Sequence, residues 1–139
     1  MGNIRVEGKK LIYQRKDELT IIEPYGMNCL RCRSTKNSKI LDENWTVLPP
    51  ATADDCHIEC DGKFATITNG AMKATIDAGQ IWYGGIITYF KKDTPVLHTR
   101  FEGDYSNRNQ HIEGDHYKIS VIFDANEGQH FYGIGQEQV

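Results

Sequence analysis

Apolar and polar residues alternate along much of this chain of 139 residues, with the two-residue period of β-strands. Short segments rich in β-branched and aromatic residues are separated by turn residues, and no stretch keeps a helical period of 3.6 residues over three turns. Strands are predicted at residues 11–15, 19–23, 29–34, 56–60, 64–69, 72–77, 80–83, 86–91, 96–100, 117–124 and 129–132. The pattern therefore predicts an all-β chain.

Two turn sequences predict how some of these strands pair. Asp61-Gly62 and Asn69-Gly70 each lie between two predicted strands. Asp-Gly and Asn-Gly readily adopt the positive φ angles that tight hairpins require. Residues 56–69 and 64–77 are therefore expected to form consecutive antiparallel hairpins of a meander.

Two long polar segments interrupt this rhythm. Residues 35–55, which contain Trp45, and residues 101–115, which contain Tyr105, are too long for tight connections and are predicted to be loops. So many strands in one chain of this length favour a single domain, residues 1–139, built as a β-sandwich or as an incomplete part of a larger sheet assembly.

Charge and hydropathy exclude several classes of partner. The chain has 16 basic and 19 acidic residues and a formal net charge of −3, which does not fit a basic nucleic-acid-binding arm. No apolar run approaches the roughly 18 residues that span a bilayer, and residues 1–6 lack the apolar stretch of a secretory signal. We therefore expect a cytoplasmic location and neither a nucleic-acid nor a membrane partner.

The four cysteines have spacings that fit more than one role. Cys29 and Cys32 form a C-x2-C pair, and Cys56 and Cys60 a C-x3-C pair, so a zinc site or two disulfides are possible. On an extended strand, however, residues three apart point to opposite faces, which separates Cys29 from Cys32. Cys56, Ile58 and Cys60 share one face. This favours buried, reduced thiols and leaves the metal site and the disulfides as alternatives.

No catalytic group can be selected from the residue pattern. Hydrolysis of a glycosidic bond needs two carboxyl groups about 5 to 10 Å apart, but acids such as Asp17, Glu18 and Asp61 lie in turn contexts where a solvated charge is expected. The chain has no Gly-x-Ser-x-Gly nucleophile elbow and no glycine-rich loop before a helix. No catalytic residue, metal ligand or cofactor is therefore assigned.

Two motifs in the chain resemble the N-terminal region of glycoside hydrolase family 31, which contains α-glucosidases and α-xylosidases. Residues 22–33 read I-E-P-Y-G-M-N-C-L-R-C-R and are similar to the pattern I-x-P-[WY]-x-x-x-x-[LI]-R-[VI]-R. Residues 131–136 read F-Y-G-I-G-Q and are similar to F-Y-G-[LIF]-G-[EQ]. The chain departs from the common residues at Cys32, where Val or Ile is usual, and at Gln136, where Glu is frequent.

This resemblance implies an antiparallel β-sandwich of the galactose-mutarotase-like type, incomplete at Val139, that packs on a catalytic (β/α)8 barrel of the same polypeptide. In that family both catalytic aspartates come from the barrel, so this chain is expected to be inactive alone. The full enzyme would hydrolyse α-linked oligosaccharides with retention, and Tyr105, Gln136 and Glu137 are expected at the rim of its active site. Sheet edges left open by an incomplete sandwich also predict a homodimer.

The motif around residues 29–34 also predicts which way the side chains of that strand point. Leu30 and Cys32 are expected to face the core, while Arg31 and Arg33 face outward and form a basic surface available to a partner domain.

Two other functions are compatible with the residues. A stand-alone carbohydrate-binding sandwich would use Trp45, Tyr83 and Tyr105 as stacking platforms for sugar rings. A small metal-dependent β-barrel would use His111, Glu113 and His116 as ligands, because the run His111–His116 places several ligand-type side chains close together in sequence.

Overall fold

The computed structural model describes residues 2–15, 18–43, 55–79, 86–98, 108–113, 116–121 and 127–128. These residues contain eleven strands and no helix. The strands are β1 (Asn3–Glu7), β2 (Lys10–Arg15), β3 (Glu18–Pro24), β4 (Leu30–Thr35), β5 (Cys56–Cys60), β6 (Phe64–Asn69), β7 (Met72–Asp77), β8 (Ile86–Lys91), β9 (Thr94–His98), β10 (Arg108–Glu113) and β11 (His116–Val121).

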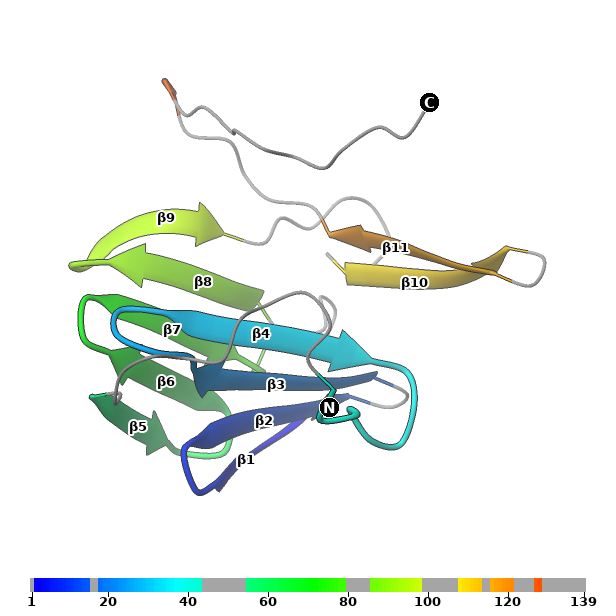
Figure 1. The fold of residues 1–139 in the computed structure, drawn as a ribbon, viewed down its shortest axis with the longest axis horizontal. Helices are drawn as coiled ribbons and strands as arrows, with labels where there is room; N and C mark the ends of the chain where they lie inside the picture. Colours follow the sequence, from blue (N-terminus) through cyan, green and yellow to red (C-terminus); the bar gives the residue numbers. More distant parts are fainter. Residues whose placement is uncertain are drawn as a thin grey trace.

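Two sheets form the layers of a sandwich (Figure 1). One has the order β1-β2-β3-β4 and the other the order β5-β6-β7-β8-β9, and every neighbouring pair is antiparallel. Across the layers β1 contacts β5, β3 contacts β6 and β4 contacts β7. Strands β10 and β11 pair only with each other among the described strands. The predicted all-β class and antiparallel β-sandwich are confirmed.

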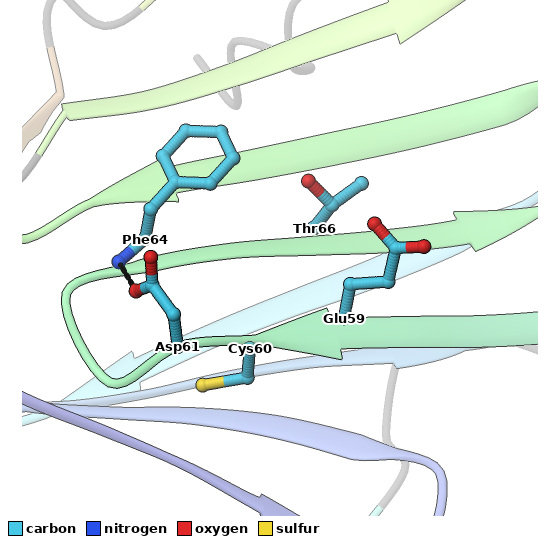
Figure 2. A pocket seen from close by; sticks show the side chains of 5 residues that line it. All are labelled: Glu59, Cys60, Asp61, Phe64 and Thr66. Carbon is cyan, nitrogen blue, oxygen red and sulfur yellow. Dashed lines mark hydrogen bonds between the residues drawn. The ribbon is translucent and has the colours of Figure 1, made fainter.

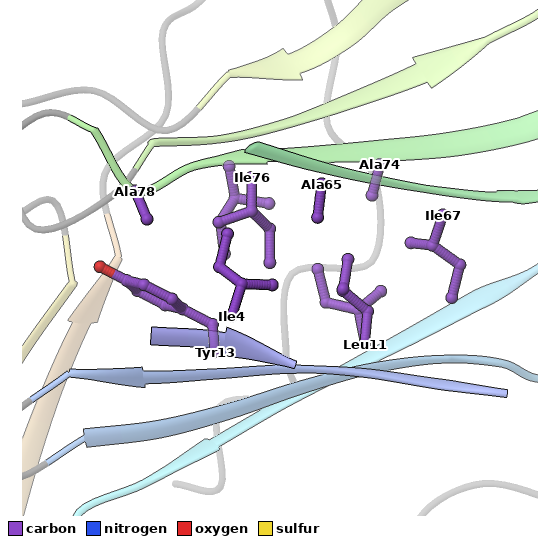
Figure 3. Close-up of a cluster of buried hydrophobic side chains, with 10 residues drawn as sticks. Ile4, Leu11, Tyr13, Ala65, Ile67, Ala74, Ile76 and Ala78 are labelled. Carbon is purple, nitrogen blue, oxygen red and sulfur yellow. The ribbon is translucent and has the colours of Figure 1, made fainter. Parts of the chain in front are cut away.

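Alternate residues of both sheets supply the core between the layers (Figure 3). The register pairs Leu11 with Ile22 in one sheet and Ile76 with Ile87 in the other, so each pair points to the same face. All four of these side chains are at most 1% exposed. The buried cluster consists of Ile4, Leu11, Tyr13, Ile22, Ala65, Ile67, Ala74, Ile76, Ala78 and Ile87.

The two predicted hairpins form as expected. Gly62 and Gly70 adopt positive φ angles of 90° and 57° at the turns that join β5 to β6 and β6 to β7. The strands on either side pair in the predicted antiparallel order, with Ile58 opposite Ile67 and Ile67 opposite Ala74. The meander prediction for residues 56–77 is therefore confirmed.

Some sequence-based boundaries were wrong. The segment 101–115, predicted to be a polar loop, contains β10, whose pairing with β11 extends from Arg108 opposite Val121 to Glu113 opposite His116. Strand β1 was not predicted, because the exposed residues on either side of Ile4 hide its single buried position. The predicted strands at residues 80–83 and 129–132 lie outside the described residues.

The cysteines are more exposed than the sequence predicted. All four thiols are reduced, but Cys29, Cys32 and Cys60 are exposed and Cys56 is half-buried. Cys32 lies on β4 and Cys60 on β5, and each of these strands is at an edge of its sheet. A side chain on the core face of an edge strand is covered from one side only, so the prediction of buried cysteines was wrong.

A helix long and apolar enough to cross a bilayer is not found among the described residues.

Candidate functional site

The three residues predicted to approach substrate, Tyr105, Gln136 and Glu137, lie outside the described residues. The same holds for Trp45 and Tyr83, two of the stacking candidates of the alternative carbohydrate-binding function. Their placement at an active-site rim or on a binding surface stays a prediction.

The ligand set of the alternative metal site falls on the β10–β11 hairpin. Glu113 and His116 are register partners, and His111 lies two residues before Glu113 on β10. The side chains of these three residues lie outside the described ones, so this ligand set stays a prediction.

A charged cluster on β3 and β4 occupies the first family-like motif. Glu23 is 7% exposed and accepts hydrogen bonds from Arg31 Nε at 2.9 Å and Arg33 Nη2 at 2.7 Å. Lys10 Nζ lies 3.6 Å from the other carboxylate oxygen of Glu23. The cluster forms because Glu23 and Arg31 are register partners, and Arg33 lies two residues further along the same face of β4.

This cluster corrects the predicted basic surface. Arg31 and Arg33 lie on the face of β4 opposite Leu30 and Cys32, as expected, but their side chains are only 17% and 18% exposed. Arg33 also donates to the backbone oxygen of Leu41 at 3.1 Å, so the segment after β4 covers part of this face. Because both guanidinium groups bond to Glu23, and Arg33 also lies 3.7 Å from Asp42, the two cations are already paired within the chain, although the three basic groups outnumber the two carboxylates.

The turn within the same motif is fixed to the other sheet by a buried amide. Asn69, at the end of β6, is fully buried, and its Nδ2 donates to the backbone oxygens of Gly26 and Cys29, both at 2.7 Å. Its Oδ1 accepts the N–H of Asp55 at 3.1 Å. Asn28 Oδ1 in turn accepts the N–H of Ala71 at 2.6 Å. The turn at residues 25–29 and the Asn69-Gly70 hairpin therefore form one hydrogen-bonded junction between the layers.

The β5–β6 hairpin carries a small hollow that the sequence did not indicate (Figure 2). Its volume is about 290 Å³, and it is lined by Glu59, Cys60, Asp61, Phe64 and Thr66. Phe64, Thr66 and Glu59 stand on the outer face of the five-stranded sheet, because β6 directs Ala65 and Ile67 into the core. The Phe64 side chain is 46% exposed. The sequence shows the Asp-Gly turn and the aromatic residue that follows it, but not that Glu59 and Thr66 lie opposite each other beside them.

Asp61 is held ionised at the tip of this hairpin. Its Oδ1 accepts the backbone N–H groups of Lys63 at 2.9 Å and Phe64 at 2.7 Å. These hydrogen bonds, the one from Phe64 first, lower the pKa of the Asp61 carboxyl below its ordinary value. Both bonds use the same oxygen, so Oδ2 can accept a further donor.

Comparison with known proteins identifies the fold more closely. No family model matches the sequence, and no curated protein matches it. A solved structure, the GH31 α-xylosidase from a soil metagenome in complex with xylose, superposes on the chain with a TM-score of 0.80 at 20% sequence identity. The superposition covers 98% of this chain and 22% of that enzyme.

The chain therefore has the fold of an antiparallel β-sandwich domain like the one in that α-xylosidase. At 20% identity the likeness establishes the fold, and this chain spans about a fifth of the length of the enzyme it resembles. The fold expected from the two sequence motifs is confirmed.

Proposed function

We propose that this chain is the non-catalytic N-terminal β-sandwich domain of a retaining α-glycosidase of glycoside hydrolase family 31, an α-xylosidase or an α-glucosidase. The observation that carries the proposal is the fold likeness to a GH31 α-xylosidase over 98% of the chain. The proposal is also supported by the two motifs at residues 22–33 and 131–136, which occur in the family's order.

The role we propose for the domain is structural support of a catalytic barrel. In such an enzyme both reacting aspartates belong to the (β/α)8 barrel of the same polypeptide, in the cytoplasm, and no cofactor takes part. The sandwich packs on the barrel, and Tyr105, Gln136 and Glu137 approach the rim of the site that binds an α-linked oligosaccharide. The domain thus shapes the substrate pocket without supplying the chemistry.

Activity assays on two lengths of polypeptide test this proposal. The 139-residue chain is expected to show no turnover of p-nitrophenyl α-D-xyloside or α-D-glucoside above buffer. The product of the complete reading frame is expected to turn over at least one of them. Turnover by the short chain, or a native stop codon directly after the codon for Val139, would contradict the proposal.

A second experiment separates this function from a stand-alone carbohydrate-binding module. Calorimetric titration of the 139-residue chain with maltose, isomaltose and isoprimeverose is expected to give no binding heat. Saturable binding of one of these sugars would favour the module instead.

Variants of the complete enzyme test the rim residues. Gln136→Ala and Glu137→Ala are expected to raise KM for an α-linked disaccharide, while Glu7→Gln, an exposed change on β1, leaves it unchanged. Unchanged kinetics of both rim variants on every α-glycoside would remove these residues from the site.

A further inference from the structure

Asn69 and Gly70 form the only Asn-Gly pair in the sequence. In such a pair the backbone nitrogen of the glycine can attack the side-chain carbonyl carbon of the asparagine, because the glycine has no side chain that hinders the approach. The nitrogen loses its proton and bonds to Cγ, while the bond from Cγ to the amide nitrogen breaks and ammonia leaves. Water then opens the succinimide ring at either carbonyl, so the product is an aspartate or an isoaspartate.

In the folded chain, hydrogen bonds already hold each group that would react. The Gly70 N–H donates to the backbone oxygen of Asp55 at 3.4 Å, and Asn69 Oδ1 accepts the Asp55 N–H at 3.1 Å. The leaving amide nitrogen, Asn69 Nδ2, donates to the backbone oxygens of Gly26 and Cys29 at 2.7 Å each. The Asn69 side chain is also fully buried, away from the water that the reaction consumes. Ring closure therefore requires all these bonds to break.

We propose that Asn69 is a deamidation site that the fold protects and that separation of the two layers exposes. The bonds from Asn69 to Gly26 and Cys29 join the five-stranded sheet to the β3–β4 turn, so they are lost when the layers part. Gly70, held at a φ of 57° in the hairpin, then moves freely between conformations. The reaction rate follows the fraction of time that the junction is open.

The product cannot rebuild the junction. A carboxylate at position 69 has no N–H to donate to the oxygens of Gly26 and Cys29, and its charge would lie in a fully buried position. An isoaspartate also adds a methylene to the backbone where Asn69 pairs with Met72 across the hairpin. Because the step is irreversible, each opening carries a chance of permanent damage, and the stability of the sandwich sets the lifetime of the unmodified chain.

Asn37 provides a reference position within the same chain. It precedes Ser38 in the segment after β4 and is exposed, so its deamidation does not need the layers to separate. The side chain of Ser38 hinders the attack more than Gly70 does. In the unfolded chain Asn69 is therefore expected to react faster than Asn37, and in the folded chain this order is expected to reverse.

Peptide mass spectrometry during incubation of the 139-residue chain at mildly alkaline pH measures both positions. Asn69 is expected to deamidate at least about a hundredfold more slowly in buffer than in concentrated urea. The rate at Asn37 is expected to change far less. The chain deamidated at Asn69, separated by ion exchange and returned to buffer, is expected to unfold at a lower urea concentration than the parent.

Leu11→Ala tests the role of layer separation from the other sheet. Leu11 is a fully buried residue of β2, and its truncation destabilises the packing between the layers. Deamidation of Asn69 in buffer is expected to accelerate by about a hundredfold, up to the rate in urea. A variant too unstable to fold is expected to react at the urea rate. Val6→Ala, a 43% exposed change on β1, is the matched control and is expected to leave the rate unchanged.

Four results would overturn the proposal. Equal rates at Asn69 in buffer and in urea would show that the fold gives no protection. A slower reaction at Asn69 than at Asn37 in urea would show that the Asn-Gly pair is not especially reactive. An Asn69 rate that Leu11→Ala does not change would show that separation of the layers is not the exposing event. A deamidated chain as stable as the parent would show that the product still forms the junction.

Discussion

At the scale of single residues, the most constrained side chain is a polar one in an otherwise apolar interior. Asn69 is fully buried, and its two amide donors and its oxygen are all used in bonds to backbone groups of Gly26, Cys29 and Asp55. A buried polar group is tolerated when all its partners are present and is costly when one is missing. Asn69 therefore fixes how the β3–β4 turn meets the β6–β7 hairpin.

Replacing this amide by a carboxylate of the same size tests that role. Asn69→Asp keeps the shape but removes both donors, and it points a buried carboxylate at the carbonyl oxygens of Gly26 and Cys29. We expect the free energy of unfolding in urea to fall by about 3 kcal/mol or more. Asn3→Asp, an exposed change on β1, is the control. A loss below about 1 kcal/mol would mean that the junction does not depend on these bonds.

Asp61 is expected to make the free energy of unfolding depend on pH. Its pKa is lowered in the folded state by the backbone N–H groups of Phe64 and Lys63. The stabilisation is therefore complete above the ordinary Asp pKa of 3.8 and is lost as pH falls through the lower, folded pKa. We expect Asp61→Asn to be less stable than the parent at neutral pH, with a difference that shrinks in this acid window. Urea unfolding across pH, with the exposed change Glu127→Gln as control, measures it, and a difference that does not change with pH would contradict it.

At the scale of elements, the charged cluster joins β2, β3 and β4 on the outer face of their sheet. Glu23 pairs with Lys10, Arg31 and Arg33, one from β2 and two from β4. The two arginines are mostly covered, so removal of the carboxylate leaves cations that water cannot fully solvate.

Removing that charge is expected to weaken the sheet. Glu23→Gln should lower the free energy of unfolding by about 3 kcal/mol, because it removes the carboxylate that accepts hydrogen bonds from two largely buried guanidinium groups. Glu7→Gln breaks an ion pair with Arg5 whose side chains are 44% and 60% exposed, and it should cost less than about 1 kcal/mol. Thermal unfolding of both variants compares them. Equal losses of unfolding free energy would show that the buried ion pairs of Glu23 stabilise the fold no more than the exposed pair of Glu7.

Two glycine turns separate the cost of a left-handed backbone from the cost of a steric collision. Gly8 and Gly70 have nearly the same φ, 58° and 57°, but a Cβ at Gly8 meets open space, whereas a Cβ at Gly70 collides with the Asn28 side-chain oxygen. Gly8→Ala should cost about 1 kcal/mol, the price of the left-handed conformation alone. Gly70→Ala should cost about 3 kcal/mol, because it adds displacement of the Asn28 amide and of its bond to Ala71. Equal costs in urea unfolding would mean that Asn28 moves freely.

The same elements show what the sequence could predict. Strands at residues 56–60, 64–69, 72–77 and 86–91 have the predicted bounds, because strict alternation and glycine turns determine them locally. Strand β10 was missed because Arg108, Asn109 and Gln110 are polar and carry no alternation. The burial of Glu23 and the exposure of Cys32 depend on which strands lie at a sheet edge and on what covers each face, and single-strand patterns do not contain that information. The hollow at Phe64 likewise needs the register of β5 against β6.

At the scale of the whole molecule, neither sheet can bury its apolar face alone. Leu11, Tyr13 and Ile22 of the first sheet pack against Ile67 and Ile76 of the second, and all five are at most 1% exposed. The Asn69 junction adds hydrogen bonds across the same interface. The two layers should therefore unfold as one cooperative unit.

This cooperativity can be tested by making a cavity in the four-stranded sheet and measuring hydrogen exchange in the five-stranded one. Leu11→Ala, on β2, should lower the free energy of unfolding by about 3 kcal/mol, as truncation of a fully buried leucine does. If the sandwich opens as one unit, hydrogen exchange of the slowest amides in β6 and β7 should accelerate by about a hundredfold, the factor that corresponds to this loss. Val6→Ala, a 43% exposed change on β1, should leave these rates almost unaltered. Unchanged protection of β6 and β7 in Leu11→Ala would mean that the five-stranded sheet holds together without the four-stranded one.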